Sequence, residues 1–181
     1  MKKCKTCRTE FAPIKPMQSV CSPSCALSLA TSKRAKALKV EQVKDKRETK
    51  QKLDKLKSKA QWAKEAQTEF NKFIRLRDAD QPCISCGRHH TGQYHAGHFL
   101  SVGARPELRF TESNVHKQCA PCNTHLSGNA VLFRARLLER FGIELVEWLE
   151  GPHAPRRDTV DTLIALKREY AAKARALEDA Q

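Results

Sequence analysis

The residue types best suited to chemistry lie between residues 83 and 129, around two pairs of cysteines. Cys83-Ile-Ser-Cys86 and Cys119-Ala-Pro-Cys122 are both Cys-x-x-Cys turns, and 32 residues separate them. Thiolates at this spacing are typical ligands of a structural zinc ion. A second set of four cysteines lies near the N-terminus. The sequence therefore predicts two structural zinc ions, one bound by Cys4, Cys7, Cys21 and Cys25 and the other by Cys83, Cys86, Cys119 and Cys122.

Disulfide bonds are the alternative use of the eight cysteines. The chain begins Met1-Lys2-Lys3 with no apolar stretch behind it, so it shows no secretion signal, and this favours zinc. The sequence also has no run of about 18 apolar residues, the length that spans a bilayer. We therefore expect a cytoplasmic protein that does not contact membranes.

One histidine and one asparagine are placed to support hydrolysis of a phosphodiester. That reaction needs a base to activate water and a cation to neutralise charge on the phosphate. His98 lies twelve residues past Cys86, far enough for a hairpin to return over the zinc, and imidazole accepts a proton near neutral pH. Asn123 directly follows Cys122, and its amide oxygen suits Mg²⁺ or Mn²⁺. We expect His98 to act as general base and Asn123 to bind the catalytic metal.

Both residues have a structural alternative. His98 could be a histidine of the core, and Asn123 could cap the N-terminus of a helix. Asn114 is expected to hold the hairpin loop by bonds from its side chain to the backbone, a structural part of the same constellation.

The order of these motifs resembles a known group of nucleases. Cys-x-x-Cys, then Gly97-His98-Phe99, then Asn114, then Cys-x-x-Cys followed at once by Asn123, is similar to zinc-containing HNH (His-Me finger) nucleases such as the phage resolvase endonuclease VII. The resemblance implies a small, zinc-stabilised α+β fold with a ββα-metal core. It also implies that His98 is the general base and that Asn123 is a ligand of the catalytic metal.

A closer resemblance covers nearly the whole chain. The N-terminal cysteines, the basic helix, residues 93–99, Glu107-Leu-Arg-Phe110 and His125-Leu-Ser-Gly-Asn129 together are similar to the lambda-type phage NinG (Rap) recombination proteins. That family implies a structure-specific endonuclease acting on branched DNA, such as Holliday junctions and D-loops, during phage recombination.

One position departs from the HNH pattern. HNH sites commonly have an aspartate just before the catalytic histidine as second metal ligand, and here that residue is Gly97. His95 and His125 are the leading replacements. Strand alternation puts His95 and His98 on opposite faces, so His95 would need a bulge to reach the same ion. His125 would need an irregular helical turn. The sequence leaves the second ligand open.

The charge of the chain favours a polyanionic partner. Lys and Arg number 34 against 20 acidic residues, for a net charge of +14 and a pI near 9.6. Such a chain binds DNA phosphates through counterion release, without base specificity. The expected phosphate contacts are Arg105, Arg109, Lys117, Arg134 and Arg136 around the site and Lys33, Arg34, Lys44, Lys46, Arg47 and Lys55 from a basic arm.

Composition also predicts the organisation of the chain. We expect an N-terminal zinc knuckle (1–27), a basic helical arm or linker (28–76), an HNH-like domain (77–150) and a C-terminal helix (151–181). The knuckle should lead into a helix near Ser22 or Ser24, and residues 69–76 should pack an apolar side onto the next domain.

Three further helices are expected after the last cysteine pair. Residues 131–141 should form a helix closed by Gly142, with its apolar stripe made of Val131, Leu132, Leu137, Leu138 and Phe141. Residues 143–149 should form a short helix with Trp148 as core anchor. A last helix should start at Asp158 or Thr159 and place Leu163, Leu166 and Tyr170 inward.

The expected function is metal-dependent cleavage of branched double-stranded DNA, with two zinc ions, catalytic Mg²⁺ or Mn²⁺ and no small-molecule cofactor. A homodimer is a candidate assembly because resolving a junction takes two cuts. The main alternative, favoured by Gly97, is a zinc-containing DNA-binding or adaptor protein without activity. An RNA-binding protein is less suited, since the stacking aromatic residues of single-strand readers are scarce.

Overall fold

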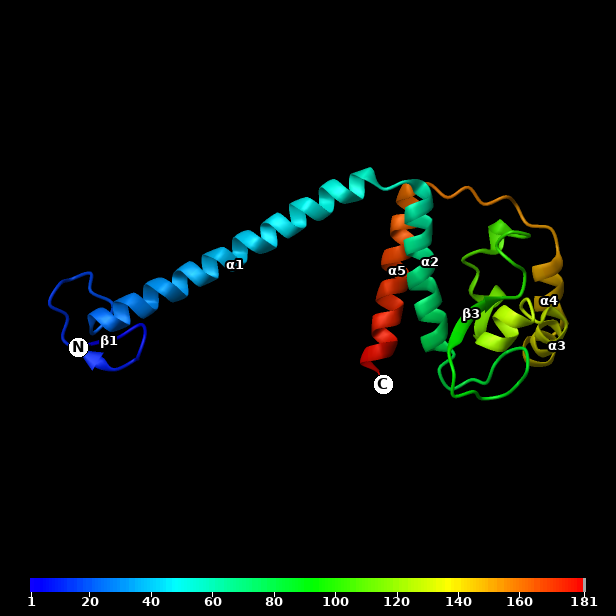
Figure 1. Cartoon of the computed structure of the whole chain (residues 1–181), viewed down its shortest axis with the longest axis horizontal. Helices are drawn as coiled ribbons and strands as arrows, with labels where there is room; N and C mark the ends of the chain where they lie inside the picture. Colours follow the sequence, from blue (N-terminus) through cyan, green and yellow to red (C-terminus); the bar gives the residue numbers. More distant parts are fainter. Residues whose placement is uncertain (181) are drawn as a thin grey trace. The chain divides into compact units, whose positions relative to one another are not determined.

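The computed structural model describes residues 1–180, which divide into two compact units (Figure 1). The first unit is Met1–Lys57, and the second begins at Ser58. The segment 28–76, expected to be one arm, is therefore divided between the units. The boundary lies between Lys57, which ends one helix, and Ser58, which begins the next. No helix in the described residues is long and apolar enough to cross a bilayer.

The first unit consists of a cysteine-rich turn region followed by one long helix. Strands β1 (Lys2–Lys3) and β2 (Glu10–Phe11) pair antiparallel. Helix α1 (Pro23–Leu56) starts at Ser22, whose hydroxyl accepts a hydrogen bond from the Cys25 amide at 3.3 Å. This confirms the predicted helix start. None of the residues of α1 is buried, so packing within this unit does not hold the helix.

Two long helices form one layer of the second unit. Helix α2 (Lys59–Arg77) begins with a capping box in which Ser58 and Gln61 bond to each other's backbone. Helix α5 (Val160–Asp179) begins in the same way, with Thr159 at its N-cap, as the sequence predicts. The two helices lie side by side (Figure 1).

The core between these helices also contacts the sheet. Phe70 of α2 meets Phe110 and Tyr170 edge to face, with ring centroids 5.7 and 4.7 Å apart. Leu163 of α5 and Val115, which begins a strand of the sheet, belong to the same buried cluster. The apolar side predicted for residues 69–76 is confirmed. The last helix, expected as a separate segment, instead shares this core with α2, because its buried residues Leu163, Tyr170 and Ala174 pack in the same cluster as those of α2.

The sheet of the second unit has two antiparallel strands. Strand β3 (Tyr94–His98) pairs with β4 (Val115–Cys119) in unbroken register, from Tyr94 opposite Cys119 to His98 opposite Val115. The connection between them includes the short helices η1 (Pro106–Leu108) and η2 (Glu112–Asn114). After β4 comes a π-helical turn, η3 (Pro121–His125).

Helices α3 (Ala130–Phe141) and α4 (Ile143–Glu150) cover a second small core. Gly142 separates them at φ +86°, a backbone conformation that favours glycine, as predicted. The prediction of which apolar residues face the core was partly wrong. Phe133 and Leu137 are the buried residues of α3, and Val146 and Leu149 are those of α4. The residues that stay exposed are Val131, Leu132, Leu138, Phe141 and Trp148.

The two predicted cysteine clusters are both assembled. In each set of four, the sulfur atoms all lie within 4.8 Å of one another. The sulfur atoms of Cys7 and Cys21 are 3.5 Å apart, and those of Cys86 and Cys119 are 4.0 Å apart. A tetrahedral zinc site with Zn–S bonds of about 2.3 Å places its sulfurs about 3.8 Å apart, whereas a disulfide needs about 2.05 Å. Both clusters therefore have the dimensions of a Zn(Cys)₄ site.

The second cluster connects segments that are distant in sequence. Cys83 and Cys86 precede β3, Cys119 ends β4 and Cys122 lies in η3. The Cys119 amide also donates to the Cys83 sulfur at 3.3 Å. This cluster fixes the end of β4 against the turn that follows it.

Metal analysis of the purified protein should find about two zinc ions per chain. Cys119→Ser should remove one of them and lower the melting temperature of the second unit, because zinc–thiolate binding in small sites contributes ~10–16 kcal/mol to folding. Cys4→Ser is the matched control and should remove the other ion while the second unit melts as in the wild type. Intramolecular disulfides found under native conditions would contradict the prediction.

Candidate functional site

The structure brings together two of the predicted metal ligands, His95 and Asn123. The side-chain amide nitrogen of Asn123 lies 3.2 Å from Nδ1 of His95. His95 belongs to β3 and Asn123 to η3, so the pair depends on the cysteine cluster that holds these segments. Both side chains line a polar pocket of about 450 Å³.

The turn η3 gives Asn123 its direction. The Leu126 amide donates to the Pro121 carbonyl at 3.1 Å, which is the wider spacing of a π-helix. Asn123 lies inside this turn and caps no helix, so the capping alternative does not apply. His125 is in the same irregular turn but is exposed, and no described contact joins it to His95 or Asn123 within residues 1–180.

His98 occupies a different position from the one expected. The register of β3 with β4 has no bulge, so alternation puts His98 on the opposite face of the sheet from His95. The structure thus places His95, and not His98, beside Asn123. The bulge that would bring both histidines to one ion is absent from the described strands.

The environment of His98 fixes its tautomer. Its Nε2 lies 3.0 Å from the Arg109 carbonyl oxygen, which can only accept, so Nε2 carries the proton. Nδ1 is then left as a proton acceptor. Burial and the nearby Arg109 charge lower the pKa of His98, although the hydrogen bond to the carbonyl acts in the other direction. The imidazole is therefore neutral at neutral pH.

Asn114 is fully buried and holds the connection between the two strands. Its oxygen accepts from the Leu100 amide at 2.9 Å, and its nitrogen donates to the carbonyls of Leu100 and Leu108 at 3.0 and 3.3 Å. All its bonds are to the backbone, so Asn114 shapes the loop that follows His98.

Several cations expected at DNA phosphates are used inside the fold. Lys117 is the clearest correction: it is buried, and its ammonium group donates to the Ala79 carbonyl at 2.5 Å and lies over the Tyr94 ring. Arg109 donates to Gln67 and Ala63, and Arg105 binds Glu107 and the Gly151 carbonyl. From sequence alone a lysine in a strand is expected to be exposed, but tertiary contacts bury Lys117.

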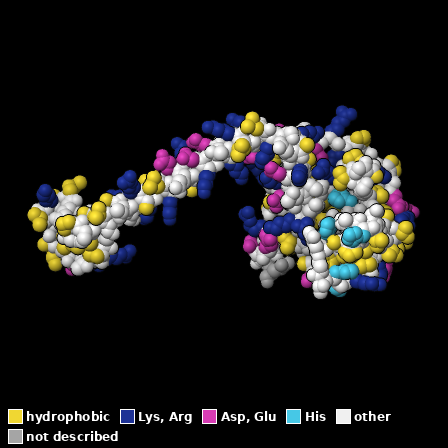
Figure 2. All heavy atoms as spheres, in the orientation of Figure 1, with side chains coloured by type: hydrophobic (Ala, Val, Ile, Leu, Met, Phe, Trp, Pro, Cys, Tyr) yellow, Lys and Arg dark blue, Asp and Glu magenta, His cyan; other side chains and the backbone are white. Residues whose placement is uncertain are grey.

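The remaining expected cations stay near solvent. Arg134 pairs with Glu150 and Arg136 with Glu139, and about two fifths of each arginine side chain is exposed. Helix α1 carries Lys and Arg along its length (Figure 2). Its predicted phosphate contacts are all exposed, namely Lys33, Arg34, Lys44, Lys46, Arg47 and Lys55.

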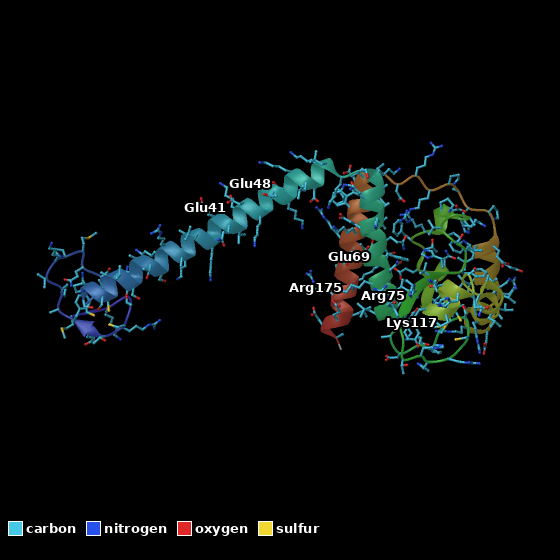
Figure 3. All side chains as sticks on the ribbon, in the orientation of Figure 1. Glu41, Glu48, Glu69, Arg75, Lys117 and Arg175 are labelled. Atoms are coloured by element: carbon cyan, nitrogen blue, oxygen red, sulfur yellow. The ribbon has the colours of Figure 1, made fainter. Side chains whose placement is uncertain are left out.

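Two residues of the site were missed in the sequence. Arg75 and Asn71, one helical turn apart on α2, line the pocket that holds His95 and Asn123. Arg75 lies toward the C-terminal end of α2 (Figure 3). Because residues four apart on a helix lie on the same face, the spacing of Asn71 and Arg75 could have indicated that the two act together.

A third missed residue lies beside the second cysteine cluster. His90, in the segment before β3, has Nε2 3.2 Å from the Cys86 sulfur, and its backbone amide donates to the Tyr94 hydroxyl. The four-residue step from Cys86 could have indicated it. An imidazole N–H at this distance would support a thiolate sulfur.

A buried charged network links α2 to β4. Arg77 binds both carboxylate oxygens of Asp78, which also accepts the Lys117 amide at 3.0 Å. Burial raises the pKa of Asp78, but hydrogen bonds from His116 and Arg77 outweigh it and hold that pKa well below its usual range. His116 stacks on Phe141 and takes no part in the cysteine cluster.

Comparison with known proteins confirms the resemblance to the NinG proteins. The chain is 42% identical to Protein ninG of Salmonella phage P22 and 40% identical to Protein ninG of Escherichia phage lambda, over 99% of this chain and 95% of each relative. Protein ninG of Enterobacteria phage H19B is 41% identical over 98% of this chain and 92% of its own length. No solved structure matches.

The family model described as Bacteriophage Lambda NinG protein matches residues 1–180. The family model and the relatives each align with essentially the whole chain. The aligned part includes the positions of both cysteine clusters and of the pocket that holds His95 and Asn123. The chain belongs to the bacteriophage lambda NinG protein family.

Proposed function

We propose that this protein is a metal-dependent endonuclease that cleaves branched double-stranded DNA. The observation that carries the proposal is the meeting of His95 and Asn123 in a polar pocket beside a cysteine cluster. A net charge of +14 supports DNA as the substrate.

The residues present fit a divalent metal ion. Nδ1 of His95 and the side-chain amide nitrogen of Asn123 lie 3.2 Å apart in a pocket whose lining is polar. Turning the Asn123 amide over would present its oxygen to an ion in place of the nitrogen. Nitrogen and neutral oxygen donors of this kind suit Mn²⁺ or Mg²⁺. His95 and Asn123 would hold the ion. When bound, it would neutralise charge on the phosphate and on the leaving oxygen.

His98 is the proposed general base. Its Nε2 is occupied by the Arg109 carbonyl, which leaves Nδ1 to accept the proton of the attacking water. Strand β3 pairs only with β4 in the described residues, so no strand is bonded to its other edge. The pocket of His95 and Asn123 is also lined by Tyr94 and Ala96, which alternate onto the face of His98. A phosphate bound in this pocket could therefore contact groups of both faces.

Arg75 is the proposed phosphate ligand within the pocket. A guanidinium group there would hold the backbone of the DNA near His95 and Asn123 without reading its sequence. Recognition of branched shape agrees with this, since the described residues offer many exposed cations and no evident base-reading element. The resemblance to NinG and HNH proteins points to the same substrate class.

The second candidate is a DNA-binding adaptor with an inactive site. The observation in its favour is Gly97, which leaves the usual carboxylate ligand position without a side chain. The two candidates differ in one measurement, cleavage of DNA.

The zinc-loaded protein should cut a labelled four-way DNA junction in Mn²⁺ or Mg²⁺. His98→Ala should lower the rate by about 10²–10⁴-fold, the usual contribution of a general base, while binding of the junction is kept. His89→Ala is the matched control because His89 is an exposed histidine outside the pocket. No cleavage by the wild type would favour the adaptor, and equal cutting by His98→Ala would remove that residue from the mechanism.

The cleavage rate should depend on pH through His98. Because burial lowers its pKa below the ordinary 6.5, the proton-accepting form persists into mildly acidic solution. The rate should therefore stay level down to pH 6.5 and fall only below it, as the imidazole becomes protonated. A fall that begins clearly above this pH in single-turnover measurements would contradict the assignment.

Helix α1 should contribute to DNA affinity through its exposed cations. Replacing Lys33, Lys44, Lys46 and Lys55 by glutamine should flatten the dependence of log K on log salt by about 0.9 for each phosphate that these lysines neutralise. Glu41→Gln with Glu48→Gln is the control on the same helix and should not flatten the slope (Figure 3). An unchanged slope in the lysine variant would make α1 a plain connector.

A further inference from the structure

The space beside Gly97 is filled by a side chain from the neighbouring strand. A Cβ atom built on Gly97 would overlap Oε1 of Gln118 and would lie 2.9 Å from both Cβ and Cδ of that side chain. Gly97 is itself buried. Glycine is thus required at position 97 because Gln118 occupies the place where another side chain would be.

The orientation of the Gln118 amide is fixed by two hydrogen bonds. Its nitrogen donates to the Ser85 hydroxyl and to the Gly128 carbonyl, both at 2.6 Å. Because a backbone carbonyl only accepts, this end of the amide must be the nitrogen. Oε1 therefore points the other way, toward Gly97.

Oε1 of Gln118 has no hydrogen-bond partner among the described residues. The side chain is completely buried, and this oxygen is inaccessible to solvent. Buried acceptors in folded proteins are nearly always satisfied, by the protein, by a bound water or by an ion. A fixed, buried oxygen without a partner indicates a missing ligand.

Gln118 lies on the face of the sheet that carries the proposed metal ligands. It is directly opposite His95 in the register of β3 and β4, so the two side chains project to the same side. Gly97, two residues after His95, projects to that side as well. Asn123 joins this group through its contact with His95.

We propose that Oε1 of Gln118 is a ligand of the divalent metal ion held by His95 and Asn123. This inference rests on the metal site of the proposed function and names its third protein ligand. The oxygen comes from β4, and it takes the space left by the glycine at position 97. The ligand set is then one imidazole and two amides, with no carboxylate.

A neutral set of this kind has a predictable metal preference. An imidazole ligand favours Mn²⁺ over Mg²⁺, and the absence of carboxylate charge weakens the binding of both ions. We expect the protein to bind Mn²⁺ more tightly than Mg²⁺ in the absence of DNA. A carboxylate placed at position 118 should strengthen Mn²⁺ binding.

The test is direct Mn²⁺ binding to the zinc-loaded, full-length protein without DNA, by calorimetry and electron paramagnetic resonance. Gln118→Glu should tighten binding at least about tenfold, and Gln118→Met should weaken it at least about tenfold. Gln81→Glu is the matched control, since it adds a carboxylate at an exposed glutamine that does not line the pocket. Zinc content and melting temperature report the folding of each variant.

Unchanged Mn²⁺ affinity in a folded Gln118→Met variant would overturn the proposal and indicate a buried water at Oε1. If that variant does not fold, an unchanged affinity in Gln118→Glu overturns it. A change in affinity for Gln118→Glu without DNA cleavage by the wild type would refute the endonuclease and support the ligand. If the wild type cleaves DNA but neither substitution changes the Mn²⁺ affinity, the endonuclease is supported and the Gln118 ligand is refuted.

Discussion

Four sulfur atoms within 4.8 Å of one another determine where the candidate site can form. Two come from the turn before β3, one from the end of β4 and one from η3, so a single ion would join three segments of the second unit. The apolar cores on either side are small, and neither encloses the turn that carries Asn123. Asn123 directly follows Cys122, so fixing the Cys122 sulfur also fixes the backbone from which the Asn123 side chain projects. Without the ion, η3 would be released, and Asn123 would no longer be held against His95.

Features set by local chemistry could be predicted from the sequence, and features set by tertiary packing could not. The cysteine sets, the helix starts at Ser22 and Thr159 and the break at Gly142 follow from residue type and spacing alone. The buried side of α3 could not be chosen, because its apolar residues cover more than one face. Lys117 was misjudged because a lysine in a strand is usually exposed, and here its contacts with Ala79 and the Tyr94 ring bury it.

The two histidines of β3 illustrate the same limit within the site. Alternation along a strand predicted that His95 and His98 face opposite sides, and the unbroken register agrees. Which of them meets Asn123 depends on the side of the sheet that η3 covers, and a single sequence holds no such information. Gln118 was missed for a related reason. Its position opposite His95, and the glycine that makes room for it, become visible only when the two strands are paired.

The positive charges of the chain fall into two groups with different physical roles. Arg77, Arg105, Arg109 and Lys117 donate to carbonyls and carboxylates inside the second unit, where they hold elements together. The cations of α1 are exposed, and packing fixes none of them. Exposed lysines attract any duplex, and that attraction weakens as salt rises, whereas Arg75 lies in a pocket with the candidate ligands. In the proposed function, affinity for DNA and placement of the phosphate would therefore depend on different residues, so a variant could change one without the other.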